Sequence, residues 1–199
     1  MKRVVITGAG TINALGRDVP ETLEAMREGR CGISELEFRD VERLAIRIGG
    51  QIKGYVPENA FNRQQMSLYD RFTQFALLAA RQAVAQSGID FTGALADCSG
   101  VVLGTSGGGL TTQDENYRSV YEEGKNRVHP FVVPKLMNNA AASHVSMEFN
   151  LKGPSFTVST ACASSNHAMA QAFQMVRSGM APAMVTGGSE SMLCFGGVK

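Results

Sequence analysis

The chain has 199 residues, of which 44% are hydrophobic and 19% charged, with 19 Lys and Arg against 18 Asp and Glu. This length can bury a large core, which excludes intrinsic disorder, and the balanced charge without a basic run argues against nucleic acid or membrane partners. No apolar stretch reaches the roughly 20 residues of a membrane span or resembles a signal peptide, so we expect a cytoplasmic protein.

The first half of the chain carries one strand pattern and two helix patterns. Arg3 to Thr7 is a short apolar run expected to form a buried strand. A helix is expected from Asp18 to Glu28, followed by an irregular excursion from Arg30 to about Gln65. The strongest helical periodicity spans Ser67 to Ser87, capped by its first residue and ended by Gly88.

The second half alternates strands with helices. The expected strands are Ser99 to Gly104, Phe156 to Thr160 and Ala183 to Thr186. The expected helices are Thr112 to Glu123, about Lys135 to Phe149 and Ser164 to Ser178, with an extended piece at Pro130 to Pro134. This order predicts an α/β fold with a mainly parallel mixed sheet, helices on both faces and functional groups at the carboxyl ends of the strands.

Glycine is abundant, with 22 residues in clusters that follow the apolar runs. The turn from Gly8 to Gly10 resembles the start of a dinucleotide-binding loop, but Asn13 stands at the third glycine position. The cluster from Gly107 to Gly109 lacks the lysine of a phosphate loop. We therefore predict tight turns, or close approach of a ligand chain or another protein segment to the backbone, and not a nucleotide site.

The four cysteines form no CxxC pair, and no cysteine or histidine stands at metal-ligand spacing, so neither a disulfide framework nor a metal site is expected. Cys31, Cys98 and Cys194 are each interpreted as small buried apolar residues. Cys162 differs because it lies among small residues between a predicted strand and a predicted helix. A thiol there meets helix dipoles and free amides, which favour the thiolate and stabilise an oxyanion, although such turns also serve packing.

The segment around this cysteine resembles the β-ketoacyl-acyl-carrier-protein synthases, which are elongating condensing enzymes. The resemblance rests on TACASSNHA, on LKGPSFTVS before it and on VTGGSES after it. Three further stretches resemble the same family in the same order, RVVITGAGTINALG, VVLGTSGGGL and HPFVVPKLMNNAAASHVSMEF. The resemblance implies a thiolase-like fold of five αβαβα layers, normally dimeric, in which residues 1–199 form the N-terminal half.

The resemblance also implies a 3-oxoacyl-acyl-carrier-protein synthase reaction in fatty-acid or polyketide elongation. Cys162 then accepts an acyl group from the phosphopantetheine thioester of acyl carrier protein, and its backbone amide supplies half of an oxyanion hole. Decarboxylation of malonyl carrier protein drives the condensation, with no cofactor. Gly107 and Val132 match positions that border the acyl pocket, and a glycine at 107 leaves room for a longer chain.

In this family two histidines, a lysine and a glycine-rich phenylalanine loop of the second half complete the chemistry. His129 and His144 are interpreted as packing or exposed residues, and so is His167, which lies about 140° around a helix from Cys162 and should point away from it. We therefore expect no chain elongation by these 199 residues alone. Two alternatives remain, a cysteine thioesterase or hydrolase, and a non-catalytic half-domain for dimerisation or carrier docking.

Overall fold

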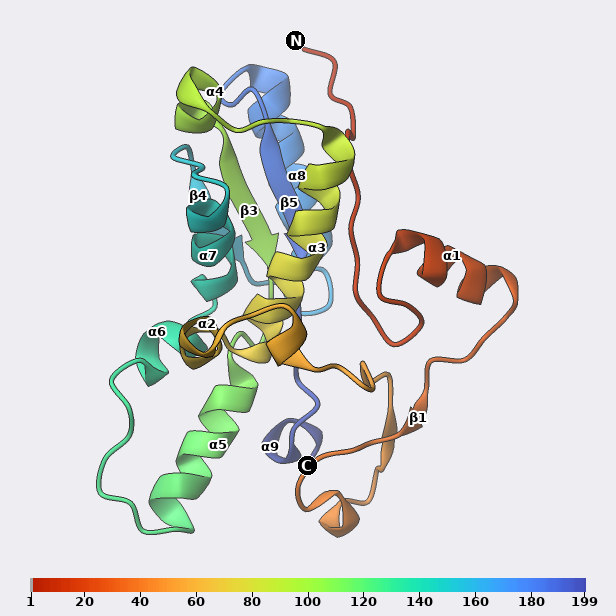
Figure 1. Ribbon diagram of the computed structural model, residues 1–199, viewed down its shortest axis with the longest axis vertical. Helices are drawn as coiled ribbons and strands as arrows, with labels where there is room; N and C mark the ends of the chain where they lie inside the picture. Colours follow the sequence, from red (N-terminus) through yellow and green to blue (C-terminus); the bar gives the residue numbers. More distant parts are fainter. Residues whose placement is uncertain (1) are drawn as a thin grey trace.

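The computed structural model describes residues 2–199 and is built around a parallel sheet of three strands (Figure 1). The strand order is β4 (Ser155–Val158), β3 (Gly100–Gly104) and β5 (Met184–Gly188). Helix α8 (Ser164–Ser178) packs across all three strands on one face, while α7 (Ala140–Glu148) packs on β3 and β4 from the other. The predicted parallel α/β arrangement with helices on both faces is confirmed.

The other elements surround this layer. Helix α3 (Arg71–Ser87) packs on α7, on the side of the sheet away from α8 (Figure 1). The remaining elements are α1 (Val19–Arg27), β1 (Ser34–Glu35), η1 (Val41–Arg43), β2 (Ile48–Gly49), η2 (Pro57–Asn59), α2 (Arg63–Leu68), α4 (Gly93–Cys98), α5 (Leu110–Tyr121), α6 (Val132–Leu136) and α9 (Phe195–Val198). The predicted excursion from 30 to 65 thus holds one short antiparallel pair, β1 with β2. None of the helices in residues 2–199 has both the length and the apolar character of a bilayer span.

The core lies between the sheet and the α3 and α7 layer. Phe72 and Leu77 of α3, Val101 of β3, and Val145 of α7 belong to it and have no exposed surface. Strand β3 is buried along its whole length because β4 and β5 flank it and helices cover both faces. Burial of such side chains stabilises the fold by about 2 kcal/mol each.

The predicted strand from Arg3 to Thr7 is wrong. This segment forms no strand, and Val5 and Ile6 are 61% and 92% exposed. The chain that follows binds α3: the amide of Ala9 donates to Oε1 of Gln86 at 2.6 Å. A polar contact with a helix side chain therefore anchors the chain just after this segment.

The glycines of the first turn serve close packing, as predicted. A Cβ on Gly8 would lie 1.9 Å from the carbonyl oxygen of Ala83, and one on Gly10 would lie 2.0 Å from that of Ala79. Real Cβ atoms do not approach backbone so closely, so these positions require glycine. The turn rests directly on the backbone of α3.

The predicted helix from Ser67 to Ser87 is two helices, because Tyr69 is extended with φ −106° and ψ 119°. Asp70, and not Ser67, caps the longer one, α3, and Gly88 ends it in a left-handed conformation as predicted. The Asp70 side chain is 2% exposed, and its Oδ2 accepts both the amide of Thr112 at 2.8 Å and the hydroxyl of that residue at 2.6 Å. The cap thus also joins α3 to α5.

Replacing Asp70 by alanine is expected to lower the free energy of unfolding by about 2 to 4 kcal/mol, because three buried donors lose their acceptor. Urea denaturation measures the change. Asn62→Ala is the matched control, since Asn62 caps α2 through a capping box at an exposed position. We expect Asn62→Ala to lower the free energy of unfolding by about 1 kcal/mol. Equal losses in the two variants would contradict the bridging role of Asp70.

The segment from 130 to 149 also departs from expectation. The extended piece at Pro130 to Pro134 is wrong, since Val132–Leu136 forms α6. Pro134 fits the first turn of a helix, where the missing amide hydrogen has no intrahelical partner. The single helix expected from Lys135 to Phe149 is likewise wrong, because Met137 is extended and α7 begins only at Ala140.

The cysteine interpretation holds for one residue of three. Cys194 is buried, whereas Cys31 and Cys98 are exposed. Cys98 ends the short surface helix α4, and Cys31 lies in the irregular segment after α1, so neither faces the central core. All four cysteines are free, and residues 2–199 contain no group of three or more His, Cys, Asp or Glu that could hold a metal ion.

Candidate active site

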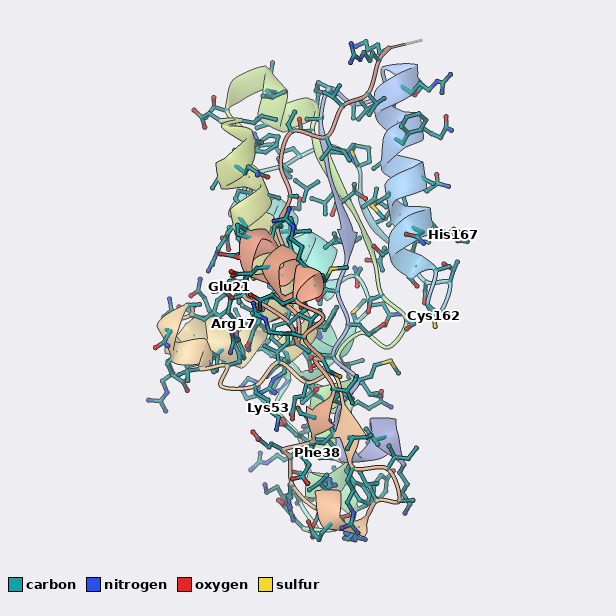
Figure 2. The ribbon with its side chains drawn as sticks, turned by 90° about the vertical axis from the view of Figure 1, so that its right-hand side faces the viewer. Arg17, Glu21, Phe38, Lys53, Cys162 and His167 are labelled. Carbon is teal, nitrogen blue, oxygen red and sulfur yellow. The ribbon has the colours of Figure 1, made fainter. Side chains whose placement is uncertain are left out.

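Cys162 lies in the tight connection between β4 and α8, at the carboxyl end of the sheet. Figure 2 shows it in the loop at the foot of α8. The thiol-bearing residue is exposed, and the preceding Ala161 has a left-handed backbone with φ 49°. A residue other than glycine in that region costs about 1 kcal/mol, and such strain is concentrated at functional turns.

Ser164 fixes this turn. Its buried hydroxyl accepts the amide of Thr160 at 2.9 Å and donates to the carbonyl of Ala161 at 2.7 Å. Two backbone bonds close the same turn, from Ala163 to Thr160 and from Ser164 to Ala161, both at 3.1 Å. The backbone on both sides of Cys162 is therefore held by a single side chain, a role that the sequence analysis missed.

Glycines bring the strand ends into contact with the first turn of α8. A Cβ on Gly104, the last residue of β3, would lie 2.3 Å from the carbonyl carbon of Ser164. A Cβ on Gly188, the last residue of β5, would lie 2.7 Å from Cβ of Ser165. The two glycines are paired in the sheet register. The start of α8, and with it the position of Cys162, is thus set by close contact of Gly104 with the α8 backbone and of Gly188 with the Ser165 side chain.

The start of α8 carries backbone amides that no N-cap side chain accepts. Ala163, at the N-cap of α8, offers no side-chain acceptor to the first-turn amides. Within the part of the chain that the structure describes, no hydrogen bond uses the Cys162 amide as donor. Amides at the start of a 15-residue helix can stabilise negative charge on a bound oxygen. The turn is therefore suited to an oxyanion next to the sulfur.

The histidines lie elsewhere. His167 is exposed on α8, above the loop that holds Cys162 (Figure 2). His129 precedes α6 and accepts the amide of Phe131 at 3.2 Å. His144 stacks edge-on against Tyr69 with ring centroids 4.4 Å apart. In residues 2–199 no histidine is hydrogen-bonded to the Cys162 thiol.

Burial lowers the pKa of His144, which gives the fold a pH dependence. The unfolded histidine binds a proton near pH 6.5, whereas the folded histidine binds it only at lower pH. The free energy of unfolding should therefore decrease as the pH is lowered from about 7.5 to about 5.5. His144→Gln should reduce this slope, measured by urea denaturation across the range. The control His129→Asn, at an exposed site, should keep it. A slope unchanged in His144→Gln would contradict the assignment.

Gly107 and Val132 lie on two separate segments. Gly107 belongs to the loop after β3, and Val132 is the half-buried first residue of α6. The loop reaches the far end of α6, where the amide of Gly109 donates to Leu136 at 3.0 Å. A Cβ on Gly107 would lie 3.2 Å from Cγ of Met192 and 3.3 Å from a carboxylate oxygen of Glu190. The space beside Gly107 is bounded by the segment after β5.

Two cavities lie away from Cys162. One of 450 Å³ runs between the turn after residue 9 and the segment after β5, with Arg71, Phe75 and Glu190 in its walls. The other, of 280 Å³, is lined by Arg17, Glu21 and Lys53, which Figure 2 shows on the opposite side of the molecule from Cys162. Neither is lined by Cys162, Gly107 or Val132.

Known proteins agree with this architecture. The structure superposes on the ishigamide ketosynthase/chain length factor with a TM-score of 0.88, covering 96% of this chain and 48% of that one at 22% identity. A β-ketoacyl synthase from Burkholderia phymatum gives a TM-score of 0.75 over 91% of this chain and 45% of that one, at 28% identity. The fold is thiolase-like, as expected.

Curated sequences agree as well. Nodulation protein E from Rhizobium is 40% identical over 198 residues, which cover 100% of this chain and 49% of that protein. The 3-oxoacyl-(acyl-carrier-protein) synthase 2 of Staphylococcus aureus is 37% identical over 190 residues, covering 96% of this chain and 46% of the synthase. This chain thus spans about half the length of these relatives. Because the family model "Beta-ketoacyl synthase, N-terminal domain" matches residues 1–199, the resemblance is confirmed and the chain belongs to the β-ketoacyl synthase family.

Proposed function

We propose that this chain carries the acyl-accepting half of a 3-oxoacyl-acyl-carrier-protein synthase, with Cys162 as the nucleophile. The observation that carries the proposal is the strained, backbone-fixed turn that exposes Cys162 at the start of α8. The names of the relatives support the reaction class. One solved neighbour, 21% identical, is a ketosynthase of a type II polyketide system in complex with its acyl carrier protein.

The proposed step is a transthioesterification. The Cys162 thiolate attacks the carbonyl carbon of an acyl thioester, a new C–S bond forms, and the carbonyl electrons move onto oxygen. Collapse of this intermediate breaks the bond to the carrier thiol, which leaves as a thiolate and takes up a proton. The amide of Cys162 and the first turn of α8 stabilise the transient oxyanion. These groups require neither a metal nor an organic cofactor.

The complete condensation is a wider proposal. Attack by the carbanion equivalent of malonyl carrier protein on acylated Cys162 would release the 3-oxoacyl product and CO₂. By family resemblance it needs histidines outside residues 1–199, so the chain alone is proposed to take an acyl group without elongating it. Acyl carrier protein as partner, a homodimer as the working enzyme and a cytoplasmic location belong to the same proposal.

The acyl pocket is proposed to run past Gly107 and Val132. Support comes from the missing side chain at Gly107, where Met192 and Glu190 supply the nearest atoms. Met192 is 38% exposed and has flexible torsions, so it can adapt to a bound chain. Val132 stands on α6, whose last residue is joined to the same loop.

Acyl thioesters test the proposal. The purified chain is incubated with octanoyl-acyl carrier protein, and adducts are located by peptide mass spectrometry. A stable adduct at Cys162, with free carrier thiol and without free octanoate, is the expected result. Release of octanoate would favour the thioesterase instead. Absence of selective labelling would favour a non-catalytic docking or dimerisation role, and elongation after addition of malonyl carrier protein would contradict the need for further histidines.

A further inference from the structure

We propose that Glu190 is a positioning residue that holds the loop Thr105 to Gly107 in place for the acyl group on Cys162. This inference rests on the proposed function. Glu190 follows β5 and reaches across the sheet end to the loop after β3. Its Oε1 accepts the Thr105 hydroxyl at 3.0 Å and the Gly107 amide at 3.2 Å. Its Oε2 accepts the amide and the hydroxyl of Ser106 at 2.8 Å and 2.6 Å.

The donors of the loop form an anion-binding site, and the anion is the Glu190 carboxylate. Two consecutive backbone amides that point at one carboxylate form an anion-binding concavity, and hydrogen bonds to a charged acceptor are stronger than neutral ones. Thr105 extends the set, because its hydroxyl also accepts the amide of Gly108 at 3.2 Å. An exposed glutamate has water as an alternative partner, yet this one binds three successive residues of a single loop. The loop conformation therefore depends on the carboxylate.

The chain on which Glu190 stands is itself fixed. The amide of Ser189 donates to the carbonyl of Gly104 at 3.0 Å, and its hydroxyl donates to the carbonyl of Phe72 at 2.6 Å. Phe72 is completely buried in the core. Glu190 thus links the loop to the sheet and to α3, which restrains the position of the loop.

The loop is coupled to the proposed reaction at both ends. It starts at Gly104, which touches the first turn of α8 two residues after Cys162. It continues to Gly107, where a Cβ would lie 3.2 Å from Cγ of Met192 and 3.3 Å from the Glu190 carboxylate. If Gly107 forms part of the wall of the acyl pocket, the Glu190 carboxylate fixes the position of that wall. Loss of the carboxylate should let the wall move and admit longer chains.

Amide hydrogen exchange of the 199-residue chain tests the contact itself. In Glu190→Gln the side chain keeps its shape but loses one acceptor, and exchange at Ser106 and Gly107 should accelerate roughly 10- to 100-fold. Glu190→Asp, which keeps the charge on a shorter stem, should retain part of the protection and guards against failure of the first variant to fold. Glu28→Gln, which removes an exposed partner of Arg30, is the control and should leave both amides unchanged. Unchanged exchange in Glu190→Gln overturns the proposal.

Thiol probes of increasing length test the positioning role. N-ethyl and N-decyl maleimide are compared, with modification quantified separately at Cys162 and at exposed Cys98, the internal reference. In Glu190→Gln the decyl-to-ethyl rate ratio at Cys162 should rise roughly threefold or more relative to that at Cys98. Faster amide exchange with an unchanged ratio would reduce Glu190 to a structural role and overturn the proposal. Maleimides need no acyl transfer, so failure of acyl thioesters to label Cys162 would contradict the proposed function alone.

Discussion

Replacing Cys162 by serine is expected to abolish acyl transfer to the chain. The hydroxyl of serine ionises far less readily than a thiol, and no histidine of residues 2–199 is hydrogen-bonded to this position to act as its base. We expect the rate of adduct formation with octanoyl-acyl carrier protein to fall by roughly 1000-fold or more. The measurement is intact-protein mass spectrometry over time.

The matched control is Cys98→Ser, which removes another exposed thiol at the end of α4. It should keep the wild-type rate of acylation. Stability should be unchanged in both variants, within about 0.5 kcal/mol, because both side chains are exposed and the sulfur of Cys162 makes no hydrogen bond in the described residues. Equal acylation of Cys162→Ser and wild type would contradict the nucleophile assignment.

Gly104→Ala is expected to destabilise this chain strongly, although it adds only one methyl group. The new Cβ would lie 2.3 Å from the carbonyl carbon of Ser164 and 2.4 Å from the amide nitrogen of Ser165. Both atoms are backbone, so no side chain can rotate away, and either α8 or β3 must shift. We expect a loss of about 3 kcal/mol or more in the free energy of unfolding, at the upper end of overpacking effects.

The same shift should disturb Cys162, because it moves the turn that Ser164 fixes. Urea denaturation measures the first effect, and the ratio of N-ethylmaleimide rates at Cys162 and Cys98 measures the second. Gly50→Ala is the matched control: its Cβ would meet atoms no closer than 3.7 Å, so stability should change by about 0.5 kcal/mol or less. A Gly104→Ala variant as stable as Gly50→Ala would contradict the backbone contact.

Local patterns predicted the central layer well. Helix α8 runs from Ser164 to Ser178 as expected, and Gly179 ends it with φ 82°. Strand β3 matches within one residue, since a continuous apolar run between turns leaves few alternatives. The position of Cys162 between β4 and α8 followed from the same patterns. Its proposed role came from family resemblance, and not from periodicity.

The errors arose where distant partners decide the structure. Arg3 to Thr7 has strand composition but pairs with no strand, and Ala9 just after it binds the Gln86 side chain of α3. The break at Tyr69 follows from Asp70, whose side chain is bound by Thr112 more than 40 residues away. Glu190 was likewise missed, because its loop partners lie more than 80 residues earlier in the chain. One signal was present, a carboxylate directly after a strand end in VTGGSES, facing a second strand end rich in glycine and hydroxyl groups.

The contact between two glycine strand ends and the first turn of α8 also bears on how such a protein can diversify. Because the Gly104 backbone contact and the Ser164 side chain together fix the turn that holds Cys162, side chains elsewhere on β4, β5 and α8 can change without moving the sulfur. Residues that shape the space for a substrate are then free to vary while the reacting atom stays fixed. A library randomised at Met192 and neighbouring wall positions, with Gly104 and Gly188 retained, is consequently a favourable starting point for altering substrate length.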